Sequence, residues 1–228
     1  MHTDYGIDAP TVVKRLALVG AGLVAVALVV PLLLFALFPG LTLLATAGVM
    51  AHGSKVRKLA LREVWIDSLE LKGDEHLLDV GCGRGLLLVA AARRLPNGRP
   101  VGIDLWRSVD QSGNDPEETR KNAEAEGVFD KIELFTGDFR ELEFEDSTFD
   151  VVVSSWAIHN VPEKSDRDKA IREIVRVLKP GGKILIADIG PVKQYVKTLL
   201  DCGVKEVSKS APDFVFVTPT YVVKAKKP

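Results

Sequence analysis

The sequence predicts an α/β fold, a mostly parallel sheet with helices on both faces, preceded by an apolar N-terminal segment. After residue 52, short apolar runs alternate with longer amphipathic ones, which is the pattern of a parallel sheet covered by helices. Before that point the chain carries no charged residue from Leu16 to Ala51. A run of this length can cross the hydrocarbon core of a bilayer, which needs about 20 residues.

Composition restricts the classes of function. The 228 residues allow one domain of ordinary size and an appendage. With 30 basic and 31 acidic residues the net charge is −1, so no global field favours nucleic acid and we expect no such partner. The two cysteines, Cys82 and Cys202, form no CxxC pair and lie near no histidine at metal-ligand spacing. We therefore expect reduced thiols and no metal.

The apolar segment over residues 16–51 is longer than one crossing. It is interrupted by Pro31 and by the Pro39-Gly40 pair, which disturb a continuous helix. One arrangement is a single kinked span over roughly residues 16–38, followed by an interfacial stretch. The other is a tight hairpin of two short helices that turns near Pro39-Gly40. A buried pair of core helices fits poorly, because a domain this small has no interior to hide them.

Basic residues flank the apolar segment on both sides. They are Lys14 and Arg15 before it, and Lys55, Arg57, Lys58 and Arg62 after it. Because positive residues prefer the cytoplasmic side, we expect a membrane anchor with the following domain in the cytosol, and the double flank slightly favours the hairpin. A signal peptide ending at residues 45–47 is the rival interpretation, but signal-peptide apolar regions run only about 7 to 15 residues.

The chain is thus expected to have four parts. They are a short N-terminal tail (1–15), a membrane-embedded helix or helical hairpin (16–51), an amphipathic linker helix (52–75) and a ligand-binding α/β domain (76–228). The expected strands of that domain are His76–Val80, Pro100–Asp104, Ile132–Thr136, Asp150–Ser154 and Lys183–Asp188. Its expected helices are Arg84–Leu95, Pro116–Gly127, Asp166–Leu178 and Val192–Cys202. Two more extended segments, Val204–Ser208 and Phe214–Val223, follow in the tail.

A glycine-rich turn follows the first expected strand. It reads Asp79-Val80-Gly81-Cys82-Gly83-Arg84-Gly85, and glycines at alternate positions let a backbone turn sharply and approach a ligand without interference from Cβ. Asp104 ends the second strand 19 residues past Gly85, where a carboxylate can accept both ribose hydroxyls of an adenosine. Ligands of such folds bind beyond the carboxyl ends of the strands.

These residues resemble the first motif of the class I S-adenosylmethionine-dependent methyltransferases, acid-x-Gly-x-Gly-x-Gly. Four later segments match the family in order: Val101–Asp104, Gly137-Asp138, Phe149–Ser155 and Arg176–Lys183. The five matches span about half of the chain. Residues 154–160 are moreover similar to the corresponding stretch of quinone-biosynthesis and sterol-type methyltransferases. The resemblance implies a Rossmann-like seven-stranded sheet whose last strand is antiparallel, and S-adenosylmethionine as cofactor.

The resemblance also implies contacts for the methionine end of the cofactor. Gly81, Gly83 and Gly85 would line this end, with Cys82 between them as a small turn residue and Asp79 near the ammonium group. Each acid has a simpler alternative role as a cap or a solvated loop residue. The ordered combination of motifs favours the cofactor role.

The adenosine end is assigned to the next two strand ends. By the same resemblance, Asp104 would hold the ribose hydroxyls, and Leu105 and Trp106 would border the adenine. In the Gly137-Asp138 pair, the aspartate would accept a hydrogen bond from the adenine amino group, with Phe139 beside it.

Methyl transfer from a sulfonium is an in-line displacement, so a catalytic base is optional. By the resemblance, Ser154 would face the methyl group and the substrate. If the acceptor is a hydroxyl or an acidic carbon, His159 is the best candidate base, although it could instead cap or pack the following helix. Candidate substrate contacts are Asp110, Trp156, Asn160 and Tyr195.

We expect methyl transfer to a small lipophilic acceptor at the cytosolic membrane face. The long loop over residues 105–114 is expected to form one wall of the acceptor pocket. The alternatives are methylation of a small thiol or amine, a tethered cofactor-binding module without turnover, and a nicotinamide-dependent oxidoreductase. The last fits least well, because Leu86 follows Gly85 where the dinucleotide fingerprint needs its third glycine. The sequence leaves the acceptor atom and the oligomeric state open.

Overall fold

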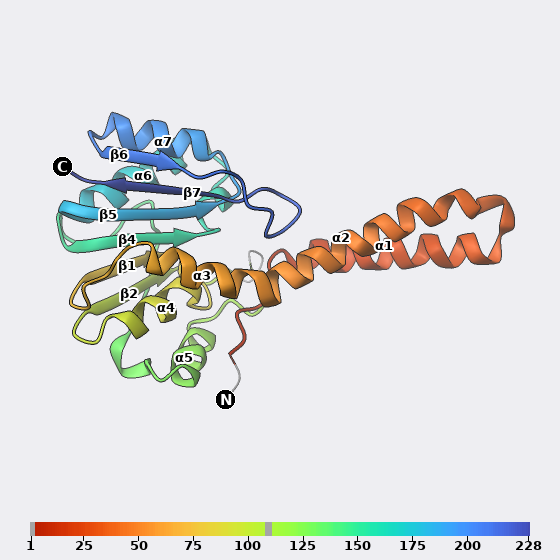
Figure 1. Ribbon diagram of the computed structural model, residues 1–228, viewed down its shortest axis with the longest axis horizontal. Coiled ribbons are helices and arrows are strands. Elements are labelled where there is room, and N and C mark those ends of the chain that lie inside the picture. Colours follow the sequence, from red (N-terminus) through yellow and green to blue (C-terminus); the bar gives the residue numbers. More distant parts are fainter. Residues whose placement is uncertain (1–2, 108–110) are drawn as a thin grey trace.

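The computed structural model describes residues 3–107 and 111–228. Within them, one sheet has the strand order β3-β2-β1-β4-β5-β7-β6 (Figure 1). The strands are β1 (His76–Val80), β2 (Arg99–Asp104), β3 (Glu133–Thr136), β4 (Phe149–Ser155), β5 (Leu178–Asp188), β6 (Lys205–Lys209) and β7 (Tyr221–Lys226). Neighbouring strands from β3 through β5 pair in parallel, and β7 pairs antiparallel with both β5 and β6. The expected mixed sheet with an antiparallel last strand is confirmed.

Helices cover both faces of the sheet because its strands are apolar on both faces. Along β1, Leu77 packs with the cluster under α3 (Lys58–Asp67) and α4 (Leu86–Arg94). The next residue, Leu78, packs with the cluster under α6 (Lys164–Val177) and α7 (Val192–Asp201). Such alternation follows from the two-residue period of a strand. The strand order reverses between β1 and β4, which opens a crevice at their carboxyl ends.

Helix α5 (Pro116–Ala125) begins as the sequence suggests. The Asp115 carboxylate accepts a hydrogen bond from the Glu117 amide at 2.8 Å, and Pro116 occupies the first helical position. Two strands differ from the expectation. Strand β5 begins at Leu178 rather than at residue 183, and strand β7 begins only at Tyr221. Residues 214–217 form the tip of the loop that connects β6 to β7, because the chain reverses there beyond the backbone bridge between Asp213 and Thr220.

The N-terminal segment forms two antiparallel helices that project away from the sheet domain (Figure 1). They are α1 (Pro10–Val29) and α2 (Leu37–His52), joined by a 3-10 turn over Pro31–Ala36. Of the two arrangements considered, the chain adopts the hairpin, but it turns at Pro31 and not at Pro39-Gly40. Pro39 lies in the first turn of α2. Backbone amides there have no hydrogen-bond acceptor within the helix, so the missing amide hydrogen of proline costs no hydrogen bond.

Two glycines allow the hairpin helices to approach closely. A Cβ on Gly20 would lie 2.8 Å from the Gly40 carbonyl oxygen, and one on Gly40 would lie 3.0 Å from that of Gly20. Small residues at such a crossing are typical of helices packed in lipid. By length and composition alone, two helical stretches here, Pro10–Val29 and Pro31–Asp67, are apolar and long enough to cross a membrane.

A short π-helical turn over Gly53–Arg57 joins α2 to α3. Helix α3 packs against α4 through Trp65 and Ile66, which are buried. The chain therefore runs as one helical path from the hairpin to the surface of the sheet. This path and the residues before α1 bring the base of the hairpin next to the crevice of the sheet.

Candidate functional site

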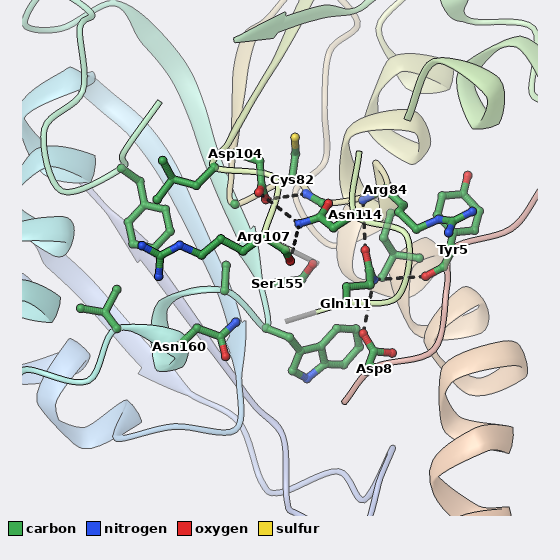
Figure 2. A pocket seen from close by; sticks show the side chains of 18 of the residues that line it. Tyr5, Asp8, Cys82, Arg84, Asp104, Arg107, Gln111, Asn114, Ser155 and Asn160 are labelled. Carbon is green, nitrogen blue, oxygen red and sulfur yellow. Dashed lines mark hydrogen bonds between the residues drawn. The ribbon is translucent and has the colours of Figure 1, made fainter. Parts of the chain in front are cut away.

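A cavity of about 270 Å³ lies at the carboxyl ends of β1, β2 and β4 (Figure 2). Six segments of the chain line it: the N-terminal residues, α3, the glycine-rich turn, and the segments after β2, β3 and β4. The sequence-predicted residues among the lining are Gly81, Cys82, Gly83, Asp104, Leu105, Asp138, Phe139, Trp156 and Asn160. The cavity is at the lower end of the size range of small-molecule sites.

The backbone of the glycine-rich turn adopts a conformation that residues with side chains rarely adopt. Gly81, Gly83 and Gly85 have φ angles of 69°, 51° and 82°, in the left-handed region that favours glycine. A Cβ on Gly81 would lie 2.3 Å from the Ala157 Cβ. The Gly81 amide donates to the Ile103 carbonyl at 2.8 Å, so the turn is fixed against the end of β2. Gly81 and Gly83 line the cavity, with the side chains of Ala157 and Gln111 packed close to them.

The Asp104 carboxylate ties the turn to the segment after β2. One oxygen accepts from the Gly83 amide at 2.9 Å, and the other accepts from the Trp106 amide at 2.6 Å and from Asn114 Nδ2 at 3.2 Å. The Asn114 side-chain oxygen is buried and has no hydrogen-bond partner among the described residues. Asp104 and Asn114 both line the cavity, and the Asn114 side chain holds the Asp104 carboxylate there.

Asp79 lies beneath the turn and does not line the cavity. One of its oxygens accepts from the Leu88 amide at 2.9 Å, while the other has no partner among the described residues. Burial, reinforced by the nearby negative charge of Asp104, raises the pKa of Asp79 to about 8. Burial also raises the pKa of the Cys82 thiol, which keeps it protonated and unsuited as a nucleophile.

The N-terminal residues form one wall of the cavity, which sequence reasoning missed. Lys58, on α3, is 1% exposed and donates to the carbonyl oxygens of Tyr5 at 2.6 Å and Gly6 at 3.2 Å. It also pairs with the Asp8 carboxylate at 2.9 Å. Burial lowers the pKa of Lys58, and Asp8 opposes this shift. Gln111 Nε2 donates to Tyr5 and Asp8, at 3.1 and 3.3 Å, so residues 5–8 are held from two sides.

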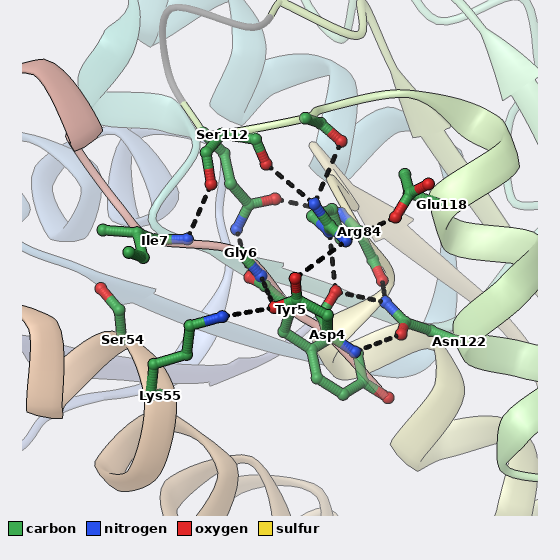
Figure 3. A network of polar contacts seen from close by, with 12 residues as sticks. Asp4, Tyr5, Gly6, Ile7, Ser54, Lys55, Arg84, Ser112, Glu118 and Asn122 are labelled. Carbon is green, nitrogen blue, oxygen red and sulfur yellow. Dashed lines mark hydrogen bonds and ion pairs between the residues drawn. The ribbon is translucent and has the colours of Figure 1, made fainter. Parts of the chain in front are cut away.

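Arg84 connects the same N-terminal residues to the glycine-rich turn (Figure 3). Its guanidinium donates to the carbonyl oxygens of Asp4 at 2.7 Å and Ser112 at 3.0 Å, and pairs with Glu118 at 2.6 Å. The Asn122 amide donates to the carbonyls of Asp4 and Arg84, at 3.0 and 2.9 Å. The turn, the N-terminal wall and α5 are thus joined in one polar network.

A carboxylate and a guanidinium face the cavity after β3. Arg140 binds both oxygens of Asp138, at 2.6 to 3.0 Å, and contacts Asp166 at 2.5 Å. The hydrogen bond from Arg140 is the main reason that the pKa of Asp138 is lowered. Asp138 therefore stays ionised, although part of its acceptor capacity is already used.

A histidine and a buried aspartate form a pair after β4. The Nδ1 atom of His159 lies 2.6 Å from one oxygen of Asp188, and the His159 amide donates to the other at 3.0 Å. The Tyr195 hydroxyl donates to that second oxygen at 3.1 Å, and burial raises the pKa of this phenol. Asp188 is 1% exposed. His159 does not line the cavity, although Ala157 and Asn160 on either side of it do.

The remaining sequence-predicted residues lie outside the lining. These are Asp79, Gly85, Trp106, Gly137, Ser154, His159 and Tyr195. Ser154 is buried and donates to the Val80 carbonyl at 2.8 Å, so it ties β4 to β1, and its neighbour Ser155 lines the cavity instead. Asp110 falls outside the residues that the structure describes. Lining residues that the sequence did not indicate include Tyr5, Asp8, Lys58, Gln111, Asn114 and Arg140.

Comparison with known sequences identifies the domain that holds this site. A family model described as a methyltransferase domain matches residues 78–186. A demethylmenaquinone methyltransferase of Lactobacillus johnsonii is 30% identical over 154 residues, which cover 67% of this chain and 58% of that protein. A sterol 4-C-methyltransferase of Caenorhabditis elegans is 33% identical over 131 residues, covering 58% and 36%. The chain thus spans 36% to 58% of the length of these relatives.

Solved structures show the same fold. A S-adenosylmethionine-dependent methyltransferase from Methanosarcina mazei superimposes with a TM-score of 0.59 at 21% identity, covering 71% of this chain and 96% of that one. A geranyl diphosphate methyltransferase in complex with sinefungin gives 0.61 at 15% identity, covering 81% and 84%. With the ordered motifs and the matched domain, this chain belongs to the class I S-adenosylmethionine-dependent methyltransferases.

Proposed function

We propose that this chain transfers the methyl group of S-adenosylmethionine to a small lipophilic acceptor at a membrane face. The observation that carries the proposal is the position of the cavity at the base of the apolar hairpin. Asp8 lies two residues before α1, Lys58 lies at the start of α3, and both line the cavity. The curated relatives named above act, by their names, on a quinone precursor and on sterols, which are acceptors that partition into bilayers.

The hairpin has the surface of a lipid-embedded element. Its outward apolar side chains include Leu32, Phe35 and Phe38, which are between 74% and 86% exposed. Within residues 16–51 the two threonine hydroxyls, Thr42 and Thr46, donate back to carbonyls of their own helix at 2.8 Å, so they present no unsatisfied donor to lipid. These features support the insertion of residues 16–51 into a bilayer.

The hairpin geometry supports entry and return on one face of the bilayer. The uncharged part of α1, from Leu16 to Val29, is about 21 Å long at 1.5 Å per residue, shorter than the roughly 30 Å hydrocarbon core. Both ends of the hairpin lie on the side of the sheet domain, as do Lys14, Arg15, Lys55 and Arg57. Positive residues prefer the cytoplasmic face, so we place the domain in the cytosol.

The cavity residues fit S-adenosylmethionine on the chemistry of their donors and acceptors. We assign the methionine end to the backbone of Gly81 and Gly83, with the Asp79 carboxyl group buried beneath them and acting on the ammonium through its charge rather than by contact. We assign the Asp104 carboxylate to the ribose hydroxyls and Asp138 to the adenine amino group. When bound, the cofactor supplies a sulfonium methyl group for in-line displacement.

The protein residues orient the acceptor and move its proton. Trp156 and Asn160 line the cavity on the β4 side, where the acceptor would be held against the cofactor. The Asp188 carboxylate beside Nδ1 favours the tautomer with its proton on Nδ1, which makes Nε2 the basic nitrogen of His159. His159 lies outside the cavity lining, between the lining residues Ala157 and Asn160. We assign to it the removal of a proton from a hydroxyl or an acidic carbon of an acceptor that reaches beyond this lining, and to Asp188 a positioning role.

The function is tested by following the methyl group. Proteoliposomes that hold this chain and either a demethylmenaquinone-type quinol or a sterol are incubated with methyl-labelled S-adenosylmethionine and extracted with organic solvent. We expect label in the organic phase with one acceptor, and loss of that label in the Asp104→Ala variant. Label confined to the aqueous phase would favour a thiol or amine acceptor. Cofactor binding without any transfer of label would indicate a non-catalytic module.

The raised pKa of Asp79 predicts a pH dependence of cofactor binding. Below its pKa of about 8 the carboxyl is protonated, whereas an ammonium beside it favours the ionised form. Binding therefore releases a proton and tightens as the pH rises toward 8, by up to about tenfold per pH unit. We expect this slope in calorimetric titrations with S-adenosylhomocysteine from pH 6 to 8. Asp79→Asn should flatten it, and a slope unchanged in that variant would remove Asp79 from the site.

If His159 is the catalytic base, replacing it should lower turnover and leave cofactor binding unchanged. Replacing His159 with Gln should lower kcat by about 10² or more, because proton transfer by a positioned side chain contributes that much. Asp188→Asn should lower kcat, since it disturbs the tautomer. Cofactor affinity should stay unchanged in both variants. If His159→Gln retains full kcat and loses only thermal stability, the residue is structural.

A further inference from the structure

The loop between β6 and β7 has an apolar tip of uneven burial. Val215 is 0% exposed and Phe216 is 8% exposed, while Phe214 and Val217 are 56% and 51% exposed. The loop is closed by reciprocal backbone hydrogen bonds between Asp213 and Thr220, at 2.7 and 2.8 Å. Two apolar side chains are therefore anchored inward, and their two neighbours are held outward on a constrained loop.

This tip rests on the base of the hairpin path. A Cβ on Gly53 would lie 2.2 Å from the Val215 carbonyl oxygen and 2.8 Å from Phe216 Cδ1, so only glycine permits the contact. Arg57, one turn later, pairs with the Asp213 carboxylate at 2.8 Å and donates to the Phe214 carbonyl. Figure 1 shows the loop before β7 extending from the domain on the same side as the hairpin. The position of the loop relative to the hairpin is thus fixed by the helical segment that follows α2.

We propose that Phe214 and Val217 form a second lipid contact, which enters the interfacial region of the leaflet that receives the hairpin. This inference rests on the proposed membrane insertion of residues 16–51. The tip packs against Gly53 at the base of the hairpin, and the basic Arg57 contacts it, which suits an apolar tip at a headgroup boundary. Because residues 214–217 lie outside the strands, their backbone is suited to the hydrated interface and not to the hydrocarbon core.

The second contact would act on the cavity wall. The Phe216 ring packs on Trp156, with ring centroids 5.3 Å apart, and Trp156 packs on Trp65 at 5.1 Å. Trp156 lines the cavity and has a φ of 49°, held by a hydrogen bond from its indole to Thr220 Oγ1 at 3.1 Å. Together with the hairpin, a lipid-bound tip would fix the rotation of the domain about the hairpin axis. The side of the cavity that Trp156 lines would then lie next to the bilayer.

Site-specific labels test the contact in the full-length chain. In a Cys202→Ser background, in which Cys82 remains buried, single cysteines replace Phe214, Leu32 or Leu200 and carry an environment-sensitive fluorophore. Leu32, 86% exposed, reports on the hairpin turn. Leu200, 55% exposed on α7, is the matched control for an exposed apolar residue away from the tip. Each variant is reconstituted into phosphatidylcholine and phosphatidylglycerol vesicles with spin-labelled lipids, and its folding is checked by binding of S-adenosylhomocysteine.

We expect a blue shift and quenching by shallow spin labels at position 214, quenching by deep labels at position 32, and neither effect at position 200. Quenching at 32 with position 214 behaving like position 200 would overturn the second contact and leave the hairpin proposal intact. The absence of quenching at both 32 and 214 would overturn membrane insertion and, with it, this inference. The methyltransferase assignment does not depend on any of these outcomes, because cofactor binding is measured separately.

Discussion

The site depends on one constraint, the attachment of the glycine-rich turn to the end of β2 by Asp104. The strand order of the sheet reverses between β1 and β4, and this reversal opens a crevice at the ends of the strands. A crevice alone does not select a ligand. The bond from the Gly83 amide to Asp104 fixes the turn in its left-handed conformation. The same carboxylate, bound by Trp106 and Asn114, stays at the cavity surface. One side chain thus both shapes the backbone cradle and presents a charged acceptor to the adenosine that we place there.

The rest of the cavity connects this cradle to the hairpin. Lys58 is buried among the carbonyls of residues 5 and 6 and the Asp8 carboxylate, all just before α1. A buried ammonium without such partners would destabilise the fold, so removing one partner would leave a buried charge without full compensation. Arg84, inside the glycine-rich turn, holds Asp4 from the other side. The position of the hairpin relative to the cavity is therefore specified by charge pairing and not by a flexible tether.

Much of the fold and part of the site could be predicted because their signals are local. Alternating apolar runs predicted the strands, and glycines with a following acid predicted the turn and Asp104. Contacts between residues far apart in sequence could not be predicted: nothing in the helical pattern around Lys58 distinguishes it from a solvated lysine, and Asp188 appeared only as a strand end before it was seen beside His159. The hairpin turn was misplaced because two proline signals competed, and the first turn of a helix tolerates Pro39.

The most direct test of the central claim is a crystal structure of the full chain in complex with S-adenosylhomocysteine. We expect the ribose hydroxyls on the Asp104 carboxylate, the amino-acid end over the backbone of Gly81 and Gly83, and the sulfur directed toward Trp156 and Asn160. Electron density for the ligand outside this cavity, or a ribose with no contact to Asp104, would contradict that claim.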